Sequence, residues 1–279
     1  MSAAASPEPA LPLPAPSGII SLLTDFGWSD PFVGVMTGVI LSHFAGARVV
    51  DLCHGVRPQA IVEAAFWLER CYHWFPRGTV HVAVVDPGVG STRRLLAAAI
   101  DGHYFLLPDN GLLSPSLLAA PGAVVLSVDV PKLGLPTPSA TFHGRDVFAP
   151  LAGGLASGTR SFESLGVPAE ALPSLLPRAA RTPLGVRGEV ICVDRYGNLI
   201  SNVDEELART SGATHIVLAG QHVPWRRTYA DAAPGELLGL VNAFGVIEIA
   251  QRDGNAERHL GITRGAAVEL IAPAAAPAR

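Results

Sequence analysis

The segment from Thr79 to Gly90, TVHVAVVDPGVG, indicates the fold class most directly. Its apolar, β-branched first half predicts a strand buried on both faces, as in a sheet that helices cover. The strand runs into Asp86 and a glycine-rich turn, and Arg93 follows three residues after that turn. A carboxylate, a flexible turn and a cation at a strand end are typical of a ligand site, but a purely structural Asp-Pro-Gly turn explains them equally well.

Strands and helices alternate on both sides of this segment. The expected strands are 19–23, 47–52, 95–100 and 104–107, and the expected helices are 32–44, 58–75 and 146–156. This alternation predicts an N-terminal α/β sandwich domain with a mostly parallel sheet. In such a sheet, the loops at the carboxyl ends of the strands hold the ligand.

The C-terminal part of the chain has a different pattern. After a proline- and alanine-rich stretch, short strand-like pieces recur at 189–193, 199–203, 215–218, 237–241, 246–249 and 267–271. This spacing predicts a smaller C-terminal β-barrel domain. We expect a disordered tail at 1–17, an N-terminal α/β domain at 18–165, a linker at 166–184, the C-terminal β-barrel domain at 185–273 and a second tail at 274–279.

Composition and charge narrow the kind of ligand. The net charge is −4 and no long run of Lys or Arg occurs, which argues against nucleic acid or an anionic membrane surface as a partner. We therefore expect a small-molecule ligand. Three widely spaced cysteines without a CxxC pair indicate neither a disulfide framework nor a thiolate zinc site. The absence of a signal-peptide pattern and of a run of ~18 apolar residues predicts a cytoplasmic protein.

Two further clusters carry side chains suited to catalysis or binding. In TFHGRD, at 141–146, His143 is either a general base or a loop histidine without a role, and Asp146 is a candidate helix cap. In the loop after the first strand, Asp25 and Asp30 are candidates for accepting hydrogen bonds from two vicinal ribose hydroxyls. The capping of a turn by these carboxylates is an equally good interpretation.

The remaining motifs are less specific. PDNG, at 108–111, is typical of a tight turn whose glycine has positive φ. In DRYGN, Asp194 and Asn198 are suited to receive an ammonium and a carboxylate, although hairpin chemistry explains them as well. No HExxH, GxGxxG, GxxxxGK[ST] or GxSxG pattern occurs, so no metal, dinucleotide, P-loop or serine-hydrolase site is predicted. The residues themselves therefore lead to an α/β enzyme with an Asp, Arg and His site, and no further.

Five of these motifs occur in a characteristic order, namely LTDFG at 23–27, VVDPGVG at 84–90, PDNG at 108–111, TFHGRD at 141–146 and YGNLISN at 196–202. Together they resemble the S-adenosylmethionine hydroxide adenosyltransferase family, which is similar to the fluorinase and chlorinase enzymes. The resemblance implies hydrolysis of S-adenosyl-L-methionine to adenosine and L-methionine by water at ribose C5′. It also implies a catalytic trio of Asp86, Arg93 and His143. The halogenating relatives carry hydroxyl-bearing residues in place of this trio, which favours water over halide here.

The resemblance also implies which residues bind substrate. Asp25 matches a ribose acceptor, while Asp30, Asp194 and Asn198 match contacts to the methionine portion. The full set of expected substrate contacts is Asp25, Asp30, Gln59, Phe142, Asp194, Asn198, Asn242, Asn255 and Ala256. The last three lie in the segment that resembles the adenine side of the site.

The family further implies a homotrimer in which each substrate lies between the first domain of one subunit and the second domain of its neighbour. No cofactor and no metal are implied, because S-adenosyl-L-methionine is the substrate. Either Asp86 or His143 is expected to take the proton from water. The alternatives are a halogenase that uses chloride or fluoride, and a non-catalytic module that binds S-adenosyl-L-methionine or adenosine.

Overall fold

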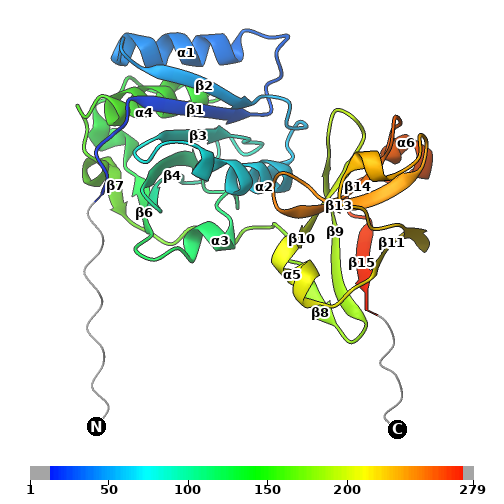
Figure 1. The fold of residues 1–279 in the computed structure, drawn as a ribbon. Coiled ribbons are helices and arrows are strands. Elements are labelled where there is room, and N and C mark those ends of the chain that lie inside the picture. Colours follow the sequence, from blue (N-terminus) through cyan, green and yellow to red (C-terminus); the bar gives the residue numbers. More distant parts are fainter. Residues whose placement is uncertain (1–12, 273–279) are drawn as a thin grey trace, which may run out of the picture. The chain divides into compact units, whose positions relative to one another are not determined.

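The computed structural model describes residues 13–272 and divides the chain between Leu176 and Pro177 into two compact units (Figure 1). This division falls inside the segment 166–184 that we expect to be a linker. Both ends of that segment form short strands that pair within their own unit's sheet, so the stretch outside both sheets is 169–179.

A seven-stranded mixed sheet forms the centre of the first unit. Its strands are β1 Ile19–Thr24, β2 Arg48–Cys53, β3 Val80–Val84, β4 Leu95–Ile100, β5 His103–Pro108, β6 Val124–Val128 and β7 Gly166–Pro168. They lie in the order β2-β1-β3-β5-β4-β6-β7, and all except β4 and β7 run in the same direction. The expected α/β class is confirmed.

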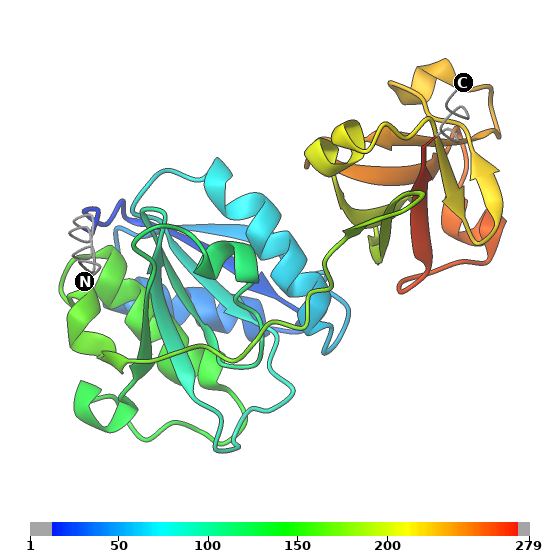
Figure 2. The same cartoon turned by 90° about the horizontal axis from the view of Figure 1, so that it is seen from below.

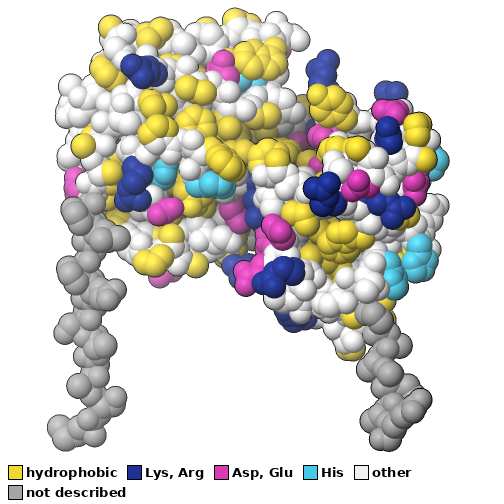
Figure 3. Space-filling view, viewed as in Figure 1, with side chains coloured by type: hydrophobic (Ala, Val, Ile, Leu, Met, Phe, Trp, Pro, Cys, Tyr) yellow, Lys and Arg dark blue, Asp and Glu magenta, His cyan; other side chains and the backbone are white. Residues whose placement is uncertain are grey.

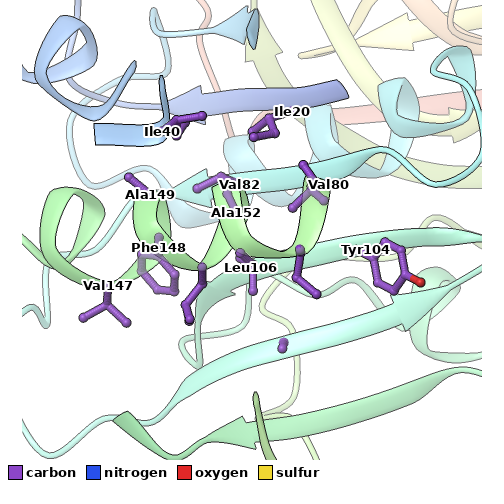
Figure 4. Close-up of a cluster of buried hydrophobic side chains, with 14 of the residues drawn as sticks. Ile20, Ile40, Val80, Val82, Tyr104, Leu106, Val147, Phe148, Ala149 and Ala152 are labelled. Carbon is purple, nitrogen blue, oxygen red and sulfur yellow. The ribbon is translucent and has the colours of Figure 1, made fainter. Parts of the chain in front are cut away.

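Helices cover both faces of this sheet. They are α1 Phe32–His43, α2 Ile61–Cys71, α3 Pro115–Leu118 and α4 Ala149–Ala156. On one face, α1 and α4 pack on alternate strand residues, and Figure 4 shows Ala152 of α4 beside Val82 and Leu106. The intervening strand residues, such as Ala83 and Phe105, pack against α2 and α3 on the other face. Two separate cores therefore enclose the sheet and fix the ends of its strands.

Shorter helical turns modify two of the expected helices. The first unit contains the 3₁₀ turns η1 Tyr72–Trp74, η2 Val130–Leu133 and η4 Phe162–Leu165, and the π-helical turn η3 Gly144–Phe148. The helix expected at 58–75 begins only at Ile61, because Gln59 has a φ of 65°, outside the helical range. The helix expected at 146–156 is preceded by the wider η3 turn, which continues directly into α4.

Residues 13–17, part of the expected N-terminal tail, lie against the first unit. Leu13 packs on its core, and the backbone carbonyl of Pro14 accepts a hydrogen bond of 2.6 Å from the Tyr104 hydroxyl. The backbone N–H of Ser17 donates to Gly78 O at 3.0 Å. The rest of that expected tail, and the tail expected at 274–279, lie outside the described residues.

The second unit is a small β-barrel, as expected (Figure 2). Its elements are β8 Ala180–Thr182, β9 Gly185–Val193, β10 Leu199–Asp204, α5 Glu205–Thr210, β11 His215–Leu218, β12 Gln221–Val223, η5 Tyr229–Asp231, β13 Leu237–Val241, β14 Val246–Gln251, α6 Ala256–Leu260 and β15 Ala267–Ile271. The strands follow the order β12-β11-β15-β9-β10-β14-β13. Gly239 N donates to Pro224 O at 2.9 Å and Arg226 N donates to Gly239 O at 2.8 Å, so the two ends of the sheet meet and nearly close the barrel.

No helix in the described part of the chain combines the length and the apolar character that crossing a bilayer requires.

Candidate active site

A cavity of about 560 Å³ opens at the carboxyl ends of β1 and β3. These strands are parallel neighbours, with Thr24 paired to Val84, so the carboxylates that follow them project from the same edge of the sheet. Six of the expected site residues line this cavity, namely Asp25, Asp30, Gln59, Asp86, Phe142 and His143. The seventh expected residue of this unit, Arg93, contacts two of them.

Arg93 forms a bidentate ion pair with Asp86. Its Nε donates to Asp86 Oδ1 at 2.6 Å, and its Nη2 donates to Asp86 Oδ2. The two side chains are 9% and 5% exposed, so solvent screens their attraction only weakly. Each carboxylate oxygen has two lone pairs and accepts only one of these bonds, which leaves Asp86 able to accept a further hydrogen bond from a ligand or a water molecule.

The glycine-rich turn returns the chain so that Arg93 reaches Asp86. Gly90 has a φ of 78°, and a Cβ atom there would lie 2.3 Å from Ala140 O. Only glycine permits this conformation together with so close an approach. The turn of the β3 loop is therefore packed directly on the chain that leads to His143.

His143 completes a three-residue contact. Arg93 Nη2 lies 3.1 Å from His143 Nδ1. A guanidinium group can only donate, so Nδ1 accepts this bond and a neutral His143 carries its proton on Nε2. Burial is the main cause that lowers the pKa of His143, and the charge of Arg93 adds to it; the carboxylates of Asp86 and Asp146 and a hydrogen bond to the Ser139 backbone oppose the shift. The net direction favours the neutral imidazole.

The segment before α4 is held by Asp146, two residues beyond the start of η3. Its Oδ2 accepts from Ser139 N at 2.8 Å, and its Oδ1 accepts from Arg145 Nε at 2.5 Å. The Arg145 hydrogen bond is the largest of the causes that lower the pKa of Asp146 to about 2. Gly144 sits where a Cβ would lie 3.0 Å from Met36 Sδ, so a small residue lets η3 pack on α1. A π-helical turn at this place fits the general tendency of such turns to occur at functional sites.

Asp25 is held by an unusual backbone conformation. Its Oδ2 accepts a hydrogen bond of 2.7 Å from Gln59 N. Gln59 has a φ of 65°, in the left-handed region that residues with side chains seldom adopt. A non-glycine residue in that region stores strain of about 1–3 kcal/mol, which the surrounding structure must offset.

Aromatic and acidic side chains divide the rest of the wall. The rings of Phe26, Phe32 and Phe142 pack against one another in pairs, edge-on or tilted, with centroids 5.4–5.8 Å apart. Asp30 adds an exposed carboxylate at the rim. The cavity therefore offers apolar surface beside a group of carboxylates, an arrangement suited to a cationic organic molecule.

The second unit holds the other expected binding residues in hydrogen-bonded turns. Asp194 Oδ1 accepts from the backbone N–H groups of Tyr196 and Asn198 at 2.8 and 2.9 Å, and Asn198 Nδ2 donates to Asp194 Oδ2 at 2.9 Å. Asn255 caps α6 by accepting from Arg258 N at 2.8 Å. These contacts are the ones expected if Asp194 and Asn198 stabilise the turn between two strands.

The structure nevertheless brings together the two turns that hold these residues, which are far apart in the sequence. A Cβ atom at Gly197, whose φ is 85°, would lie 2.1 Å from the Asn255 side chain. The N–H of Glu257, next to the buried Ala256, donates to Gly197 O at 3.0 Å. The DRYGN turn and the start of α6 therefore form one surface.

Glu248 is a site-like residue that the sequence analysis missed. It is only 3% exposed, and its carboxylate accepts from the Tyr229 hydroxyl at 2.5 Å and from Asn242 Nδ2 at 3.2 Å. Burial raises the pKa of Glu248 against the opposing effect of these two hydrogen bonds, and Asp194 raises it further. A single Glu in an alternating strand gives no sequence signal of such burial.

PDNG has the structural role expected of a turn, with one addition. Gly111 has a φ of 92°, as predicted. Asp109 is 3% exposed, accepts from Arg94 Nε at 2.8 Å and from Leu172 N at 2.8 Å, and so fixes the path of the chain beyond β7. Within residues 13–272, no group of three His, Cys, Asp or Glu side chains is placed to hold a metal ion.

The fold and this cavity define an α/β protein with a cavity suited to a small organic molecule at the strand ends of its first unit, where Arg93 contacts Asp86 and His143 of the wall. Comparison with known proteins identifies the class more closely. Residues 20–166 match the SAM hydroxide adenosyltransferase N-terminal domain, and residues 188–269 match the C-terminal domain of the same family. The chain belongs to the SAM hydroxide adenosyltransferase family.

Individual relatives agree with this assignment. The chain is 37% identical to an (R)-S-adenosyl-L-methionine hydrolase of Thermus thermophilus, over 90% of this chain and 99% of the relative. It is 25% identical to a fluorinase of Actinopolyspora mzabensis, over 90% of this chain and 96% of the relative. A crystal structure of an uncharacterized conserved protein from Thermotoga maritima superimposes with a TM-score of 0.84 at 29% identity, covering 90% of this chain and 99% of that one.

Proposed function

We propose that this chain hydrolyses S-adenosyl-L-methionine to adenosine and L-methionine. The observation that carries the proposal is the contact of Arg93 with Asp86 and His143, which line a cavity together with Asp25. Relatives named as hydrolases of this substrate cover nearly the whole chain, which supports the same reaction here.

The proposed reaction is an in-line displacement at ribose C5′. The oxygen of water forms a bond to C5′, the C5′–S bond breaks, and its electron pair goes to sulfur. The sulfonium leaves as the neutral thioether of methionine, so the leaving group needs no proton and the reaction needs no cofactor. Water loses one proton, and a side chain that accepts it contributes roughly 10²- to 10⁴-fold to the rate.

We propose that Asp86, rather than His143, contacts the attacking water. In the observed arrangement His143 Nδ1 accepts from Arg93 and Nε2 carries the proton of a neutral ring, so the imidazole has no free lone pair. The carboxylate of Asp86 retains acceptor positions beyond the two that Arg93 occupies. His143 then positions Arg93, and Arg93 holds the carboxylate toward the cavity.

The charge of the cavity supports a cationic substrate. Asp25, Asp30 and Asp86 line it, and Arg93 is the cation that neutralises one of them. The excess of carboxylates attracts the sulfonium of the substrate, and this attraction disappears when the sulfur becomes neutral. Because this attraction weakens as the sulfur loses its charge, it favours the ground state over the transition state, so net catalysis must come from aligning the water and taking its proton.

We further propose that the active form is a homotrimer in which the first unit of one subunit and the second unit of its neighbour share each substrate. The expected contacts are divided between the two units, and the first unit exposes apolar side chains on and beside α1 (Figure 3). Phe32, Val35 and Leu41 of α1 and Val50 of β2 are each 38–44% exposed. We also propose a cytoplasmic location and no nucleic-acid partner, in keeping with three widely spaced cysteines that form no CxxC pair and a net charge of −4.

The test is incubation of the purified protein with S-adenosyl-L-methionine in halide-free buffer made with ¹⁸O-labelled water. Equal amounts of adenosine and methionine, with the label in the 5′-hydroxyl of adenosine and loss of both products in Asp86→Ala, are expected. Product formation that depends on added chloride or fluoride would identify a halogenase instead. Binding without any product would identify a non-catalytic module. Analytical ultracentrifugation tests the trimer separately.

A further inference from the structure

Three hydrogen-bonded side chains, those of Thr24, His54 and Asp51, lie beside the loop that carries Asp25 and take no part in the reaction proposed above. His54 is 1% exposed, and its Nδ1 lies 2.8 Å from the hydroxyl oxygen of Thr24, which is fully buried. Its Nε2 donates to Asp51 Oδ1 at 3.0 Å, because a carboxylate can only accept. The two ring nitrogens of His54 are thus bonded to partners from β1 and β2.

These residues also hold the backbone of the two residues that follow Asp25. Phe26 N donates to the Thr24 hydroxyl oxygen at 3.2 Å, and Gly27 N donates to His54 O at 2.8 Å. The ring of Trp28 packs edge-on against the His54 ring, with centroids 4.7 Å apart. The loop and the strand end before it therefore contact His54 at three points: its backbone carbonyl, a ring nitrogen and the face or edge of its ring.

The hydroxyl, imidazole and carboxylate stand in the same order as in a hydrolase triad, but their environment excludes a nucleophile. Thr24 has no exposed surface, and its oxygen accepts a backbone N–H. It also does not line the cavity that holds Asp86. A nucleophile must reach the substrate, which Thr24 does not.

We propose that Thr24, His54 and Asp51 form a positioning network that holds Asp25 in place for the vicinal hydroxyls of ribose. The inference rests on the proposed function and on the role that the family resemblance implies for Asp25, which is to accept hydrogen bonds from these hydroxyls. Gln59 N fixes Asp25 Oδ2 from the cavity side, and the network fixes the backbone of the next two residues from the core side. With both sides fixed, the carboxylate meets the diol without reorganising, which conserves binding energy.

The test compares the binding of adenosine with that of 2′,3′-dideoxyadenosine, which lacks the diol, by titration calorimetry on the full chain. Thr24→Val keeps the volume of the side chain and removes its hydroxyl, whereas Thr24→Ser keeps the hydroxyl. We expect Thr24→Val to bind adenosine roughly 10- to 100-fold more weakly, the range for losing hydrogen bonds to a charged group. Its affinity for the dideoxy compound should stay within about threefold of the wild type, and Thr24→Ser should recover most of the adenosine affinity.

Two further variants keep the test decisive. Thr79→Val removes a buried hydroxyl that donates to Pro76 O at 2.7 Å, just before β3 and therefore at the opposite end of the sheet from the cavity. It should lower thermal stability without changing the preference for adenosine. Asp51→Ala truncates a side chain that is 43% exposed, so it removes the far partner of His54 without opening a core cavity and serves if Thr24→Val does not fold. It should lower the preference for adenosine in the same direction.

Each outcome has a distinct meaning. Equal binding of the two nucleosides by the wild-type protein would overturn the ribose role of Asp25 and this inference together. A wild-type preference for adenosine that Thr24→Val and Asp51→Ala leave intact would overturn the positioning network alone. A wild-type protein that prefers adenosine and loses this preference in both variants, yet does not cleave S-adenosyl-L-methionine, would support the network and contradict the proposed reaction.

Discussion

Replacing Asp86 by Asn separates the structural and the chemical roles of the ion pair. The substitution keeps the shape of the side chain but removes its charge, and it leaves Arg93, 9% exposed, without a counter-ion. Breaking a buried pair by removing one partner costs about 3–5 kcal/mol, and we expect the lower end because an amide oxygen still accepts one guanidinium hydrogen. At roughly 2–4 °C per kcal/mol for a unit of this size, a cost of about 3 kcal/mol lowers Tm by about 6–12 °C.

The activity of Asp86→Asn should fall further than its stability explains. If the carboxylate accepts the proton of water, kcat falls by roughly 10²- to 10⁴-fold at a temperature where the variant is fully folded. The double variant Asp86→Asn/Arg93→Gln removes the unpaired cation, so its Tm should return most of the way to that of the wild-type protein. Its kcat should remain as low as that of the single variant.

Thermal unfolding followed by near-ultraviolet circular dichroism gives Tm, and chromatographic detection of adenosine gives kcat. The reasoning is refuted if Asp86→Asn keeps its Tm within about 2 °C. A kcat within about tenfold of the wild-type value would refute the chemical part alone, because the base would then lie elsewhere.

Three further substitutions test other features. Burial, together with the nearby His103, lowers the pKa of His81 to about 3, so its stabilising effect is complete above the unfolded pKa of 6.5 and is lost as pH falls below it. Measured by urea unfolding between pH 6.5 and 4, the free energy of unfolding of His81→Gln should therefore change with pH by about 1.4 kcal/mol per pH unit less than that of the wild-type protein. Gly90→Ala places a Cβ 2.3 Å from Ala140 O at a φ of 78°, so calorimetry should show a loss of about 1–3 kcal/mol together with reduced kcat. Since the pKa of Glu248 is raised above 4.5, its ionisation destabilises the fold as pH rises, and Glu248→Gln should gain more stability relative to the wild type at pH 8 than at pH 4.5.

The sequence alone predicts the site best where a strand ends. Buried apolar runs locate β1 and β3, and the carboxylates that follow these strands within two residues, Asp25 and Asp86, line the cavity. Local patterning is sufficient there because a strand that is buried on both faces is a continuous apolar run. The polar residues that end such a run mark the loop at the edge of the sheet. The barrel strands follow from the same alternation of short apolar runs and turns.

Contacts between distant residues are beyond such patterning. The 3.1 Å approach of Arg93 to His143 depends on how closely the Gly90 turn packs on Ala140, which no local signal encodes. The tautomer of His143 depends in turn on that approach. The order of the motifs and their resemblance to a family, rather than periodicity, predicted this trio.

Backbone conformation and burial of single charges account for most of what the sequence analysis missed. Gln59 has no property that predicts a φ of 65°, yet its N–H holds Asp25. Glu248 is an ordinary strand residue in the sequence and a buried carboxylate in the barrel. The partly exposed strand β6 and the three-residue strands β7, β8 and β12 were absent from the expected elements because short or partly exposed runs give a weak signal.

The parallel pairing of β1 with β3 also bears on how this protein tolerates change. Thr24 and Val84 are register partners, so the backbone ladder, with strands about 4.8 Å apart, sets the separation of the two chains where they enter the cavity. Insertions farther along either loop leave that separation unaltered, whereas deletion of one residue within either strand turns its terminal carboxylate to the opposite face. His143 lies on no strand of this ladder and reaches the cavity from η3. Altered chemistry should therefore be sought by redesigning the chain around η3, while the two strands are kept as a fixed scaffold.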